Sequence, residues 1–192
     1  MKKLGKLLLI VVLSISTLNG ATGIKIFDLK EQVFDELSKN TINTYKVKNA
    51  LVKLKLLYHD KGYFGDADRG ETYISIKPDK KLTNWVLDED YWILNVNEER
   101  TIKFISTNST IINLTFKGQY IYINDFKYSF NAMNRIHNIK IVKNNKILNL
   151  YINGIKIYAT QTKFDKLDEI EQYLYSGNGH DGLYGYKLWE IK

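Results

Sequence analysis

Residues 139–158 read IKIVKNNKILNLYINGIKIY, and this stretch decides the fold. Apolar side chains recur at every second position before and after two short polar interruptions, and that period is typical of strands with one buried face. The second interruption, Asn153-Gly154, is the strongest two-residue hairpin signal that a sequence contains. The stretch therefore predicts consecutive antiparallel strands, with both Asn153 and Gly154 at positive φ.

The same alternation continues on both sides of this stretch. It marks further strands in residues 74–77, 101–104, 112–116, 120–123 and 183–191. Many short strands separated by turn residues are typical of an antiparallel sandwich or barrel, whereas βαβ folds alternate strands with helices. The sequence from about residue 67 onward therefore predicts a mainly β protein.

Residues 24–66 show a different pattern, which predicts a short N-terminal helical segment followed by a connector. Asp28 is a suitable N-cap for a helix over residues 29–37, with Glu31 at the capping-box position. Apolar residues then recur at steps of three and four between Val47 and Tyr58, as on one helix face. The alternation in residues 53–56 also fits a strand, which stays open as the alternative, but length and spacing favour the helix.

The composition supports a packed core in a single domain. The chain has 192 residues, of which 44% are hydrophobic and 26% charged. It contains no cysteine, which excludes disulfides, a thiolate metal site and a cysteine nucleophile.

The first 23 residues have the order of a secretory signal peptide. A basic start precedes the apolar run Leu7–Leu13, and the small residues Ala21-Thr22-Gly23 follow as a cleavage frame. The apolar run is shorter than the ~20 residues that a spanning helix needs, although an uncleaved anchor is the alternative interpretation. We therefore expect a periplasmic or secreted protein of the bacterial envelope with no transmembrane segment after cleavage.

Cleavage would also change the charge of the protein. Removing Lys2, Lys3 and Lys6 lowers the net charge from +7 to +4, and arginine is rare among the basic residues that remain. Because arginine is the usual side chain for bidentate contacts with phosphates and bases, nucleic acid is not an expected partner.

Residues 137–154, 176–191 and 71–78 together resemble one family of sandwiches. They read HNIKIVKNNKILNLYING, SGNGHDGLYGYKLWEI and ETYISIKP, and they are similar to the paired strands, the closing loop and the early strand of laminin-G-like and concanavalin-A-like jelly rolls. The resemblance covers about residues 70–192 and implies a concanavalin-A-like β-sandwich (jelly roll). It implies no single function, because these folds include lectins, hydrolases, lyases and adhesion modules. The family often has more strands than residues 70–192 supply, which favours a strand for residues 44–58.

Enzyme motifs are weak in this sequence. Glycanases of this fold carry carboxylates in the pattern Glu-x-Asp-x-x-Glu, and the nearest stretch, residues 165–171, does not match it. The apolar spacing from Phe164 to Leu174 instead predicts a short amphipathic helix with exposed acids. A lyase that uses a Tyr/His pair stays open, although we expect His137 to pack or cap at the start of a strand. No catalytic residue is predicted.

Cofactor signals are also weak. Asp66-Ala67-Asp68 and Asn178–Asp181 offer oxygen ligands for calcium, but such loops are usually ordinary turns. Scattered histidines without cysteine do not make a zinc site, and no phosphate-binding glycine loop is present. We expect no cofactor.

Aromatic side chains mixed with acids and amides suggest a surface that binds sugars. One set lies in residues 84–92 and a second in residues 175–186, so the predicted ligand-binding residues are Trp85, Tyr91, Trp92, Tyr184 and Tyr186. The alternative is that some of these rings belong to the core. We therefore predict a non-catalytic recognition module with carbohydrate as ligand. The alternatives are a protein that docks another envelope protein through its N-terminal helical segment, and a glycan-cleaving enzyme.

Overall fold

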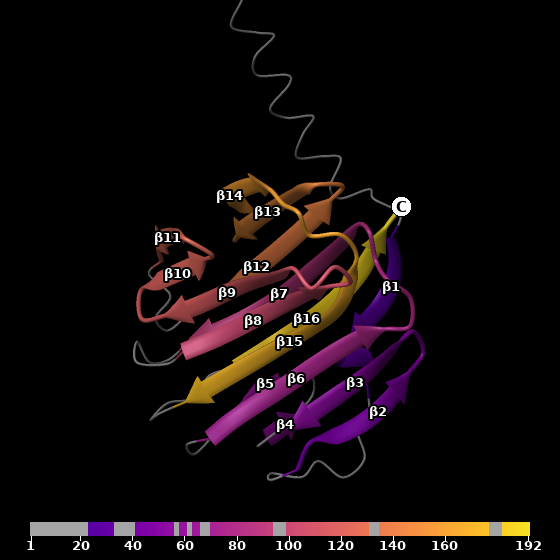
Figure 1. Cartoon of the computed structure of the whole chain (residues 1–192). Helices are drawn as coiled ribbons and strands as arrows, with labels where there is room; N and C mark the ends of the chain where they lie inside the picture. The colour runs from indigo at the N-terminus through magenta and orange to yellow at the C-terminus, as the bar shows by residue number, and fades with distance from the viewer. Residues whose placement is uncertain are drawn as a thin grey trace, which may run out of the picture.

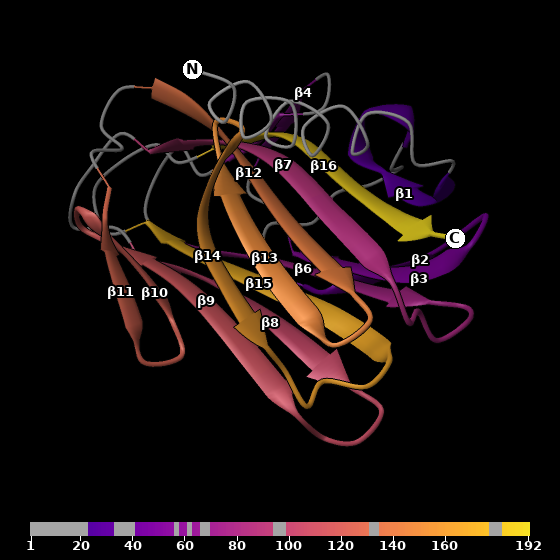
Figure 2. The same cartoon turned by 90° about the horizontal axis from the view of Figure 1, so that it is seen from above.

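The computed structural model describes residues 23–32, 41–55, 58–60, 63–65, 70–93, 99–130, 135–176 and 182–192. The strands in these ranges form two eight-stranded sheets that lie face to face, and neighbouring strands within each sheet are antiparallel (Figures 1 and 2). The predicted β-sandwich is thus confirmed.

Sheet A begins at the edge formed by β14 and ends at β4, with β1 paired to β16. Its order is β14 (Ile155–Gln161), β13 (Ile147–Ile152), β12 (Arg135–Asn144), β7 (Trp85–Ile93), β16 (Gly182–Ile191), β5 (Tyr63–Gly65) and β4 (Tyr58–Asp60), with β1 (Gly23–Asp28) beside β16.

Sheet B contains the remaining strands. Its order is β11 (Phe126–Ser129), β10 (Tyr120–Ile123), β9 (Ile111–Lys117), β8 (Glu99–Ser106), β15 (Leu167–Ser176), β6 (Gly70–Pro78), β3 (Ala50–Lys55) and β2 (Asn43–Val47). The chain passes between the sheets several times, for example from β6 to β7 and from β7 to β8, so strands that are neighbours in a sheet are often distant in the sequence.

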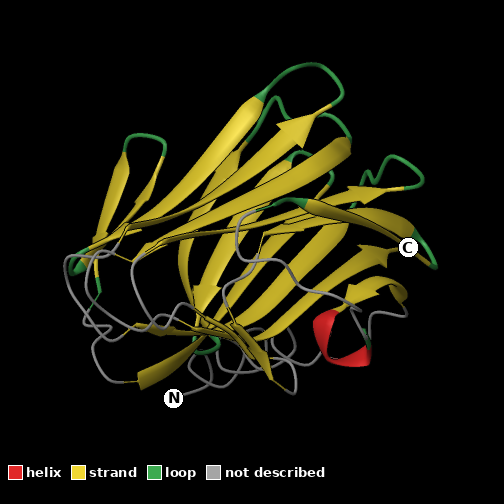
Figure 3. Cartoon of the chain, turned by 90° about the horizontal axis from the view of Figure 1, so that it is seen from below, coloured by secondary structure: helices red, strands yellow, loops and turns green. Residues whose placement is uncertain are grey.

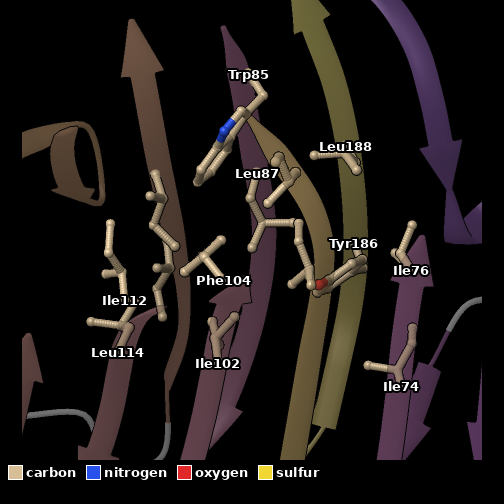
Figure 4. Packing of buried hydrophobic residues seen from close by; sticks show 14 of the residues in the cluster. Ile74, Ile76, Trp85, Leu87, Ile102, Phe104, Ile112, Leu114, Tyr186 and Leu188 are labelled. Atoms are coloured by element: carbon tan, nitrogen blue, oxygen red, sulfur yellow. The ribbon is translucent and has the colours of Figure 1, made fainter. Parts of the chain in front are cut away.

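The core lies between the two sheets because alternate side chains of each strand point inward. Trp85 and Leu87 of β7 are fully buried, as is Ile102 of β8 (Figure 4). The ring of Trp85 stacks on that of Phe104 from the opposite sheet, with centroids 4.9 Å apart and planes inclined by 17°. This packing joins the two sheets through apolar contacts.

The hairpin predicted at Asn153-Gly154 is confirmed. The two residues have φ angles of 49° and 79°, and Ile152 pairs directly with Ile155. These are the backbone angles that a two-residue turn of type I′ requires.

The predicted N-terminal helical segment is wrong in the residues that the structure describes. A single 3₁₀ turn, Leu29–Glu31, follows β1, and Asp28 caps it by accepting a hydrogen bond from the backbone N–H of Lys30 at 3.2 Å (Figure 3). The rest of the predicted first helix, residues 33–37, lies outside the described residues.

The second predicted helix is the hairpin β2–β3. Val47 and Ala50 lie opposite each other across a two-residue turn, so their spacing of three belongs to the hairpin and not to a helix turn. After the turn, Ala50, Val52 and Leu54 alternate inward and are buried. β3 pairs with β6, which makes this segment part of sheet B.

The amphipathic helix predicted around residues 164–174 is also wrong, because this segment forms β15. The register shifts between Leu167 and Glu169, where a β-bulge adds one residue to the strand. The bulge places Leu167 and Ile170 both in the core at a spacing of three. A bulged strand therefore produced the spacing that indicated a helix.

Candidate functional site

Sheet B carries a group of polar and aromatic side chains on its outer face. We call it the tyrosine–glutamate cluster; its members come from the three adjacent strands β6, β15 and β8, and they are Tyr73, Ser75, Lys103, Glu169, Glu171 and Tyr173. Strand pairing brings these residues together, because Tyr173 lies opposite Tyr73 and Glu171 lies opposite both Ser75 and Lys103. Their sequence neighbours Ile74, Ile76 and Ile170 point into the core.

Glu171 is the centre of this cluster. Its Oε1 accepts a hydrogen bond from the hydroxyl of Tyr73 at 3.4 Å, and its Oε2 accepts one from Tyr173, also at 3.4 Å. The ammonium of Lys103 lies 3.4 Å from the same Oε2. Glu171 therefore holds two phenols and one ammonium around a single carboxylate.

The two tyrosine rings lie against each other, with centroids 4.9 Å apart and planes inclined by 47°. Lys103 Nζ lies 5.6 Å from the centroid of the Tyr173 ring. Beside them, the hydroxyl of Ser75 donates a hydrogen bond to Glu169. The cluster thus presents aromatic carbon next to hydroxyl, carboxylate and ammonium groups.

Burial raises the pKa of Tyr73 to about 12, with Glu171 adding to the shift and the hydrogen bond to Ser75 opposing it. The phenol is therefore neutral at physiological pH and acts as a hydrogen-bond donor. A tyrosine that serves as a catalytic base requires the opposite shift.

The sequence did contain a signal for this cluster. Glu169, Glu171 and Tyr173 are spaced by two, as are Tyr73 and Ser75, which is the spacing of residues on one strand face. The alternation of Glu169, Glu171 and Tyr173 was overlooked because the segment was interpreted as a helix. No local sequence pattern indicates that β15 pairs with β6.

The predicted ligand-binding residues do not form one surface. Trp85, Tyr91 and Tyr186 are buried in the core, with at most 1% of their surface exposed, so their rings present no face to solvent. Trp92 is half-buried on the opposite face of β7. The side chain of Tyr184 lies outside the part of the chain that can be described. A strand alternates between two environments, which is why the set separates.

A second polar group lies on the outer face of sheet A, on the side of β7 that carries Trp92. We call Asp88, Asp90, Asn138 and Lys140 the aspartate cluster. Asn138 Nδ2 donates hydrogen bonds to Asp88 Oδ1 at 2.7 Å and to Asp90 Oδ1 at 3.0 Å, and Lys140 forms an ion pair with Asp88 at 3.2 Å. Gly185 pairs with Asp90, and a Cβ at that position would lie 3.2 Å from Asp90 Oδ2.

Within the described ranges, an ion pair between Glu89 of β7 and Arg100 of β8 lies in the interior of the sandwich. Both side chains are fully buried. With the amide of Gln172 oriented so that its oxygen faces the guanidinium, this oxygen accepts hydrogen bonds from Arg100 Nε at 2.8 Å and Nη2 at 2.9 Å. Burial raises the pKa of Glu89, and Arg100 opposes that shift. Because both groups are fully buried, this pair joins the sheets and offers no surface to a ligand.

His137 packs as predicted. It is buried, its ring lies 4.5 Å from that of Phe130 in an edge arrangement, and its Nδ1 is 3.0 Å from Asn153 Nδ2 at the hairpin turn. This histidine therefore belongs to the packing of the β12 end and the hairpin.

Metal binding finds no support in the described residues, which contain no group of three or more His, Asp or Glu side chains that could hold an ion. The two loops that offer oxygen ligands for calcium, residues 66–68 and 178–181, lie outside them. In the same ranges no helix has the length and apolarity that crossing a bilayer requires.

Comparison with solved structures identifies the fold. The chain is similar to the catalytic domain of an endo-1,3-beta-glucanase (laminarinase) from Thermotoga petrophila, with a TM-score of 0.63 and 9% identity over 90% of this chain and 99% of that domain. It is also similar to a sialidase, with a TM-score of 0.56 and 10% identity over 78% of this chain and 17% of the sialidase.

A third similar structure is the binding domain of botulinum neurotoxin DC in complex with SialylT, with a TM-score of 0.53 and 13% identity over 75% of this chain and 44% of that one. This chain therefore spans only a part of the sialidase and of the neurotoxin structure. No protein-family model and no curated protein matches the sequence. At these identities the likeness shows the fold alone, an antiparallel β-sandwich of the jelly-roll type.

Proposed function

We propose that this protein is a non-catalytic carbohydrate-recognition module that binds a glycan at the tyrosine–glutamate cluster on the outer face of sheet B. The observation that carries the proposal is the convergence of Tyr73, Tyr173 and Lys103 on the carboxylate of Glu171. The similar structures are a laminarinase, a sialidase and a domain bound to SialylT. These names support carbohydrate as the class of ligand.

The chemistry of the cluster suits a sugar. A pyranose presents a face of C–H groups and a rim of hydroxyls. The half-buried ring of Tyr173 offers apolar surface to the C–H face. The half-buried Glu169, Glu171 and Lys103 supply acceptors and donors for the hydroxyl groups, while the buried Ser75 holds Glu169 in place.

Recognition is favoured over cleavage by the state of these side chains. Glycoside hydrolysis uses one carboxylic acid that gives a proton and one carboxylate that attacks or activates water. Glu171 is instead engaged by three donors, and the raised pKa of Tyr73 keeps its phenol protonated. The cluster is therefore suited to holding a ligand rather than to proton transfer.

A second candidate surface is Trp92 together with the aspartate cluster on sheet A. Trp92 is half-buried and follows Asp88 and Asp90 on the same face of β7, so a ring and two carboxylates lie in line. This surface contains Trp92, which the sequence predicted as a ligand-binding residue. Tyr184, another predicted ligand-binding residue, belongs to the adjacent strand β16. The alternative in which a protein docks on an N-terminal helix loses its basis, because the described residues of that segment form strands and a short 3₁₀ turn.

A glycan-binding screen of the protein tests the proposal, followed by calorimetry with the best glycan. We expect Tyr173→Ala to weaken binding by about 1–2 kcal/mol through the loss of apolar contact. Trp92→Ala is the matched control on the other sheet, and it should bind normally. The opposite result, with Trp92→Ala weakened and Tyr173→Ala normal, would move the site to sheet A. Cleavage of the bound glycan by the protein would contradict a non-catalytic function and indicate an enzyme.

We also propose export to the periplasm or the exterior, on the basis of the signal-peptide pattern in residues 1–23. A likeness to laminin-G-like sandwiches in particular is also part of the proposal, and the expectation that the protein needs no cofactor stays a prediction.

A further inference from the structure

One end of the sandwich contains a pocket of about 830 Å³. It is bounded by the β12–β13 turn, the β8–β9 turn and the connection from β14 to β15, which gather at the same end of the molecule in Figure 2. The pocket is lined by residues of these turns and lies apart from the tyrosine–glutamate cluster. Its volume is in the range of pockets that hold small organic ligands.

A buried lysine lies at this pocket. Ile139, Ile141 and Lys143 follow one another on the inward face of β12, so the alternation that buries the two isoleucines also buries Lys143, which is only 1% exposed. Its ammonium donates a hydrogen bond to the carbonyl oxygen of Thr83 at 2.6 Å and lies 5.9 Å from the ring centroid of Phe164. Burying an ammonium beside isoleucines is energetically unfavourable, so packing alone does not explain a lysine at this position.

The charge of Lys143 is only partly balanced, because the attraction of Asp165 does not offset the burial of the ammonium. Among the described residues no carboxylate forms an ion pair with it, and one hydrogen bond uses only one of its three N–H donors. Asp165 lines the same pocket, but its Oδ2 accepts a hydrogen bond from Thr107 at 3.2 Å instead. A buried charge without a partner is unfavourable, so an anion that reached the ammonium would be stabilised there.

The rest of the lining indicates what kind of anion fits. Asn145, Gln161 and Thr162 contribute amide and hydroxyl groups, which form hydrogen bonds with ligand hydroxyls. The exposed lysines Lys146 and Lys163 also line the pocket and attract negative charge, whereas Asp165 disfavours ligands with two charges. The pocket is also larger than an inorganic ion requires.

We propose that this pocket binds a small hydroxylated carboxylate of the size of a sugar acid, with its carboxylate on the ammonium of Lys143 and its hydroxyls on the amide and hydroxyl groups of the rim. The site is independent of the tyrosine–glutamate cluster. A failure of one proposal therefore leaves the other standing.

Calorimetry with three probes tests this site. D-glucuronate carries both the carboxylate and the hydroxyls, D-glucose lacks the charge, and acetate lacks the hydroxyls. We expect the wild-type protein to bind glucuronate more tightly than either of the others. Equal binding of glucose, tighter binding of acetate, or no binding of glucuronate would overturn the proposal.

Variants then assign the site to Lys143. Lys143→Met keeps the length of the side chain and removes the charge, so glucuronate affinity should fall by about tenfold or more. Lys156→Met, at an exposed position on β14, is the matched control and should bind normally. If Lys143→Met fails to fold, Lys146→Glu reverses an exposed charge at the rim and should also weaken binding. Tyr173→Ala should bind glucuronate like the wild type, and unchanged affinity in the Lys143 or Lys146 variant contradicts the proposal.

Discussion

Glu89 of sheet A and Arg100 of sheet B form an ion pair in the middle of the sandwich, with both side chains fully buried. The guanidinium also lies over two rings, 3.9 Å from the centroid of Tyr91 and 5.0 Å from that of Phe116. A buried polar contact thus joins the two sheets inside an apolar core. Each charge depends on the other, because water does not reach either of them.

Removing both partners should therefore cost less free energy of unfolding than the two single removals added together. We expect Arg100→Met alone to lower the free energy of unfolding by about 3–5 kcal/mol, since it leaves Glu89 as an unpaired buried charge. The double variant Glu89→Leu with Arg100→Met should lose clearly less than the two single changes combined. Urea unfolding of the four proteins gives the coupling, and additive losses would show that the pair does not interact.

The hairpin at Asn153-Gly154 gives a test of backbone strain without crowding. Gly154 has φ of +79°, and no atom lies within 4 Å of where its Cβ would be. Gly154→Val should therefore destabilise the protein by about 1–2 kcal/mol through the left-handed backbone alone. Gly154→Asn is the control and should cost less, because asparagine adopts positive φ more readily. Equal denaturation midpoints for all three proteins would argue against this turn.

Trp85 and Trp92 lie on opposite faces of β7 and should respond differently to truncation. Trp85 is fully buried and stacked on Phe104, so Trp85→Ala should cost about 3–5 kcal/mol. Trp92 is half-buried, and Trp92→Ala should cost well below that. Thermal unfolding of the two variants compares them directly, and a larger loss for Trp92 would place it in the core.

These two tryptophans also show how far the sequence could be interpreted. Alternation of apolar residues predicted the strands and the turn at Asn153-Gly154, because both depend on residues close together in the chain. It did not tell which face of β7 is buried. The predicted binding set therefore mixed Trp85 with Trp92, although neighbouring positions of opposite parity face opposite ways.

The two wrong helices have local causes of their own. The β2–β3 hairpin places Val47 and Ala50 three positions apart, and the bulge in β15 does the same for Leu167 and Ile170. A spacing of three between apolar residues is also a helical spacing. The tyrosine–glutamate cluster was missed for a different reason. Tyr73 and Glu171 are 98 residues apart in the chain, and only the pairing of β6 with β15 brings them into contact.

The export proposal predicts the N-terminus of the mature protein. After expression with the full sequence in a bacterium, the protein recovered from the envelope or medium should begin near Thr22 or Ile24, because small residues there suit signal peptidase. N-terminal sequencing provides the measurement. A chain from that fraction that still begins at Met1 or Lys2 would contradict cleavage.

Lys143 predicts a pH dependence of stability with a definite sign. Burial lowers the pKa of Lys143 below its usual 10.5, and Asp165 only partly opposes this shift. Between the folded pKa and 10.5 the unfolded chain binds more protons, so the contribution of this residue to stability rises with pH in that window. Lys143→Met lacks this titration, and the exposed charged groups Lys146 and Lys163 are present in both proteins. Wild type should therefore gain stability relative to Lys143→Met as urea unfolding is repeated from pH 8 to pH 10.5. Saturating glucuronate should make this gain smaller, because a bound carboxylate favours the charged amine and raises its pKa.

The opposite outcome would be a relative stability that falls with pH in the absence of ligand. It would mean that the protein itself supplies a counter-charge to Lys143, so that an anion in the pocket would not be stabilised by this ammonium.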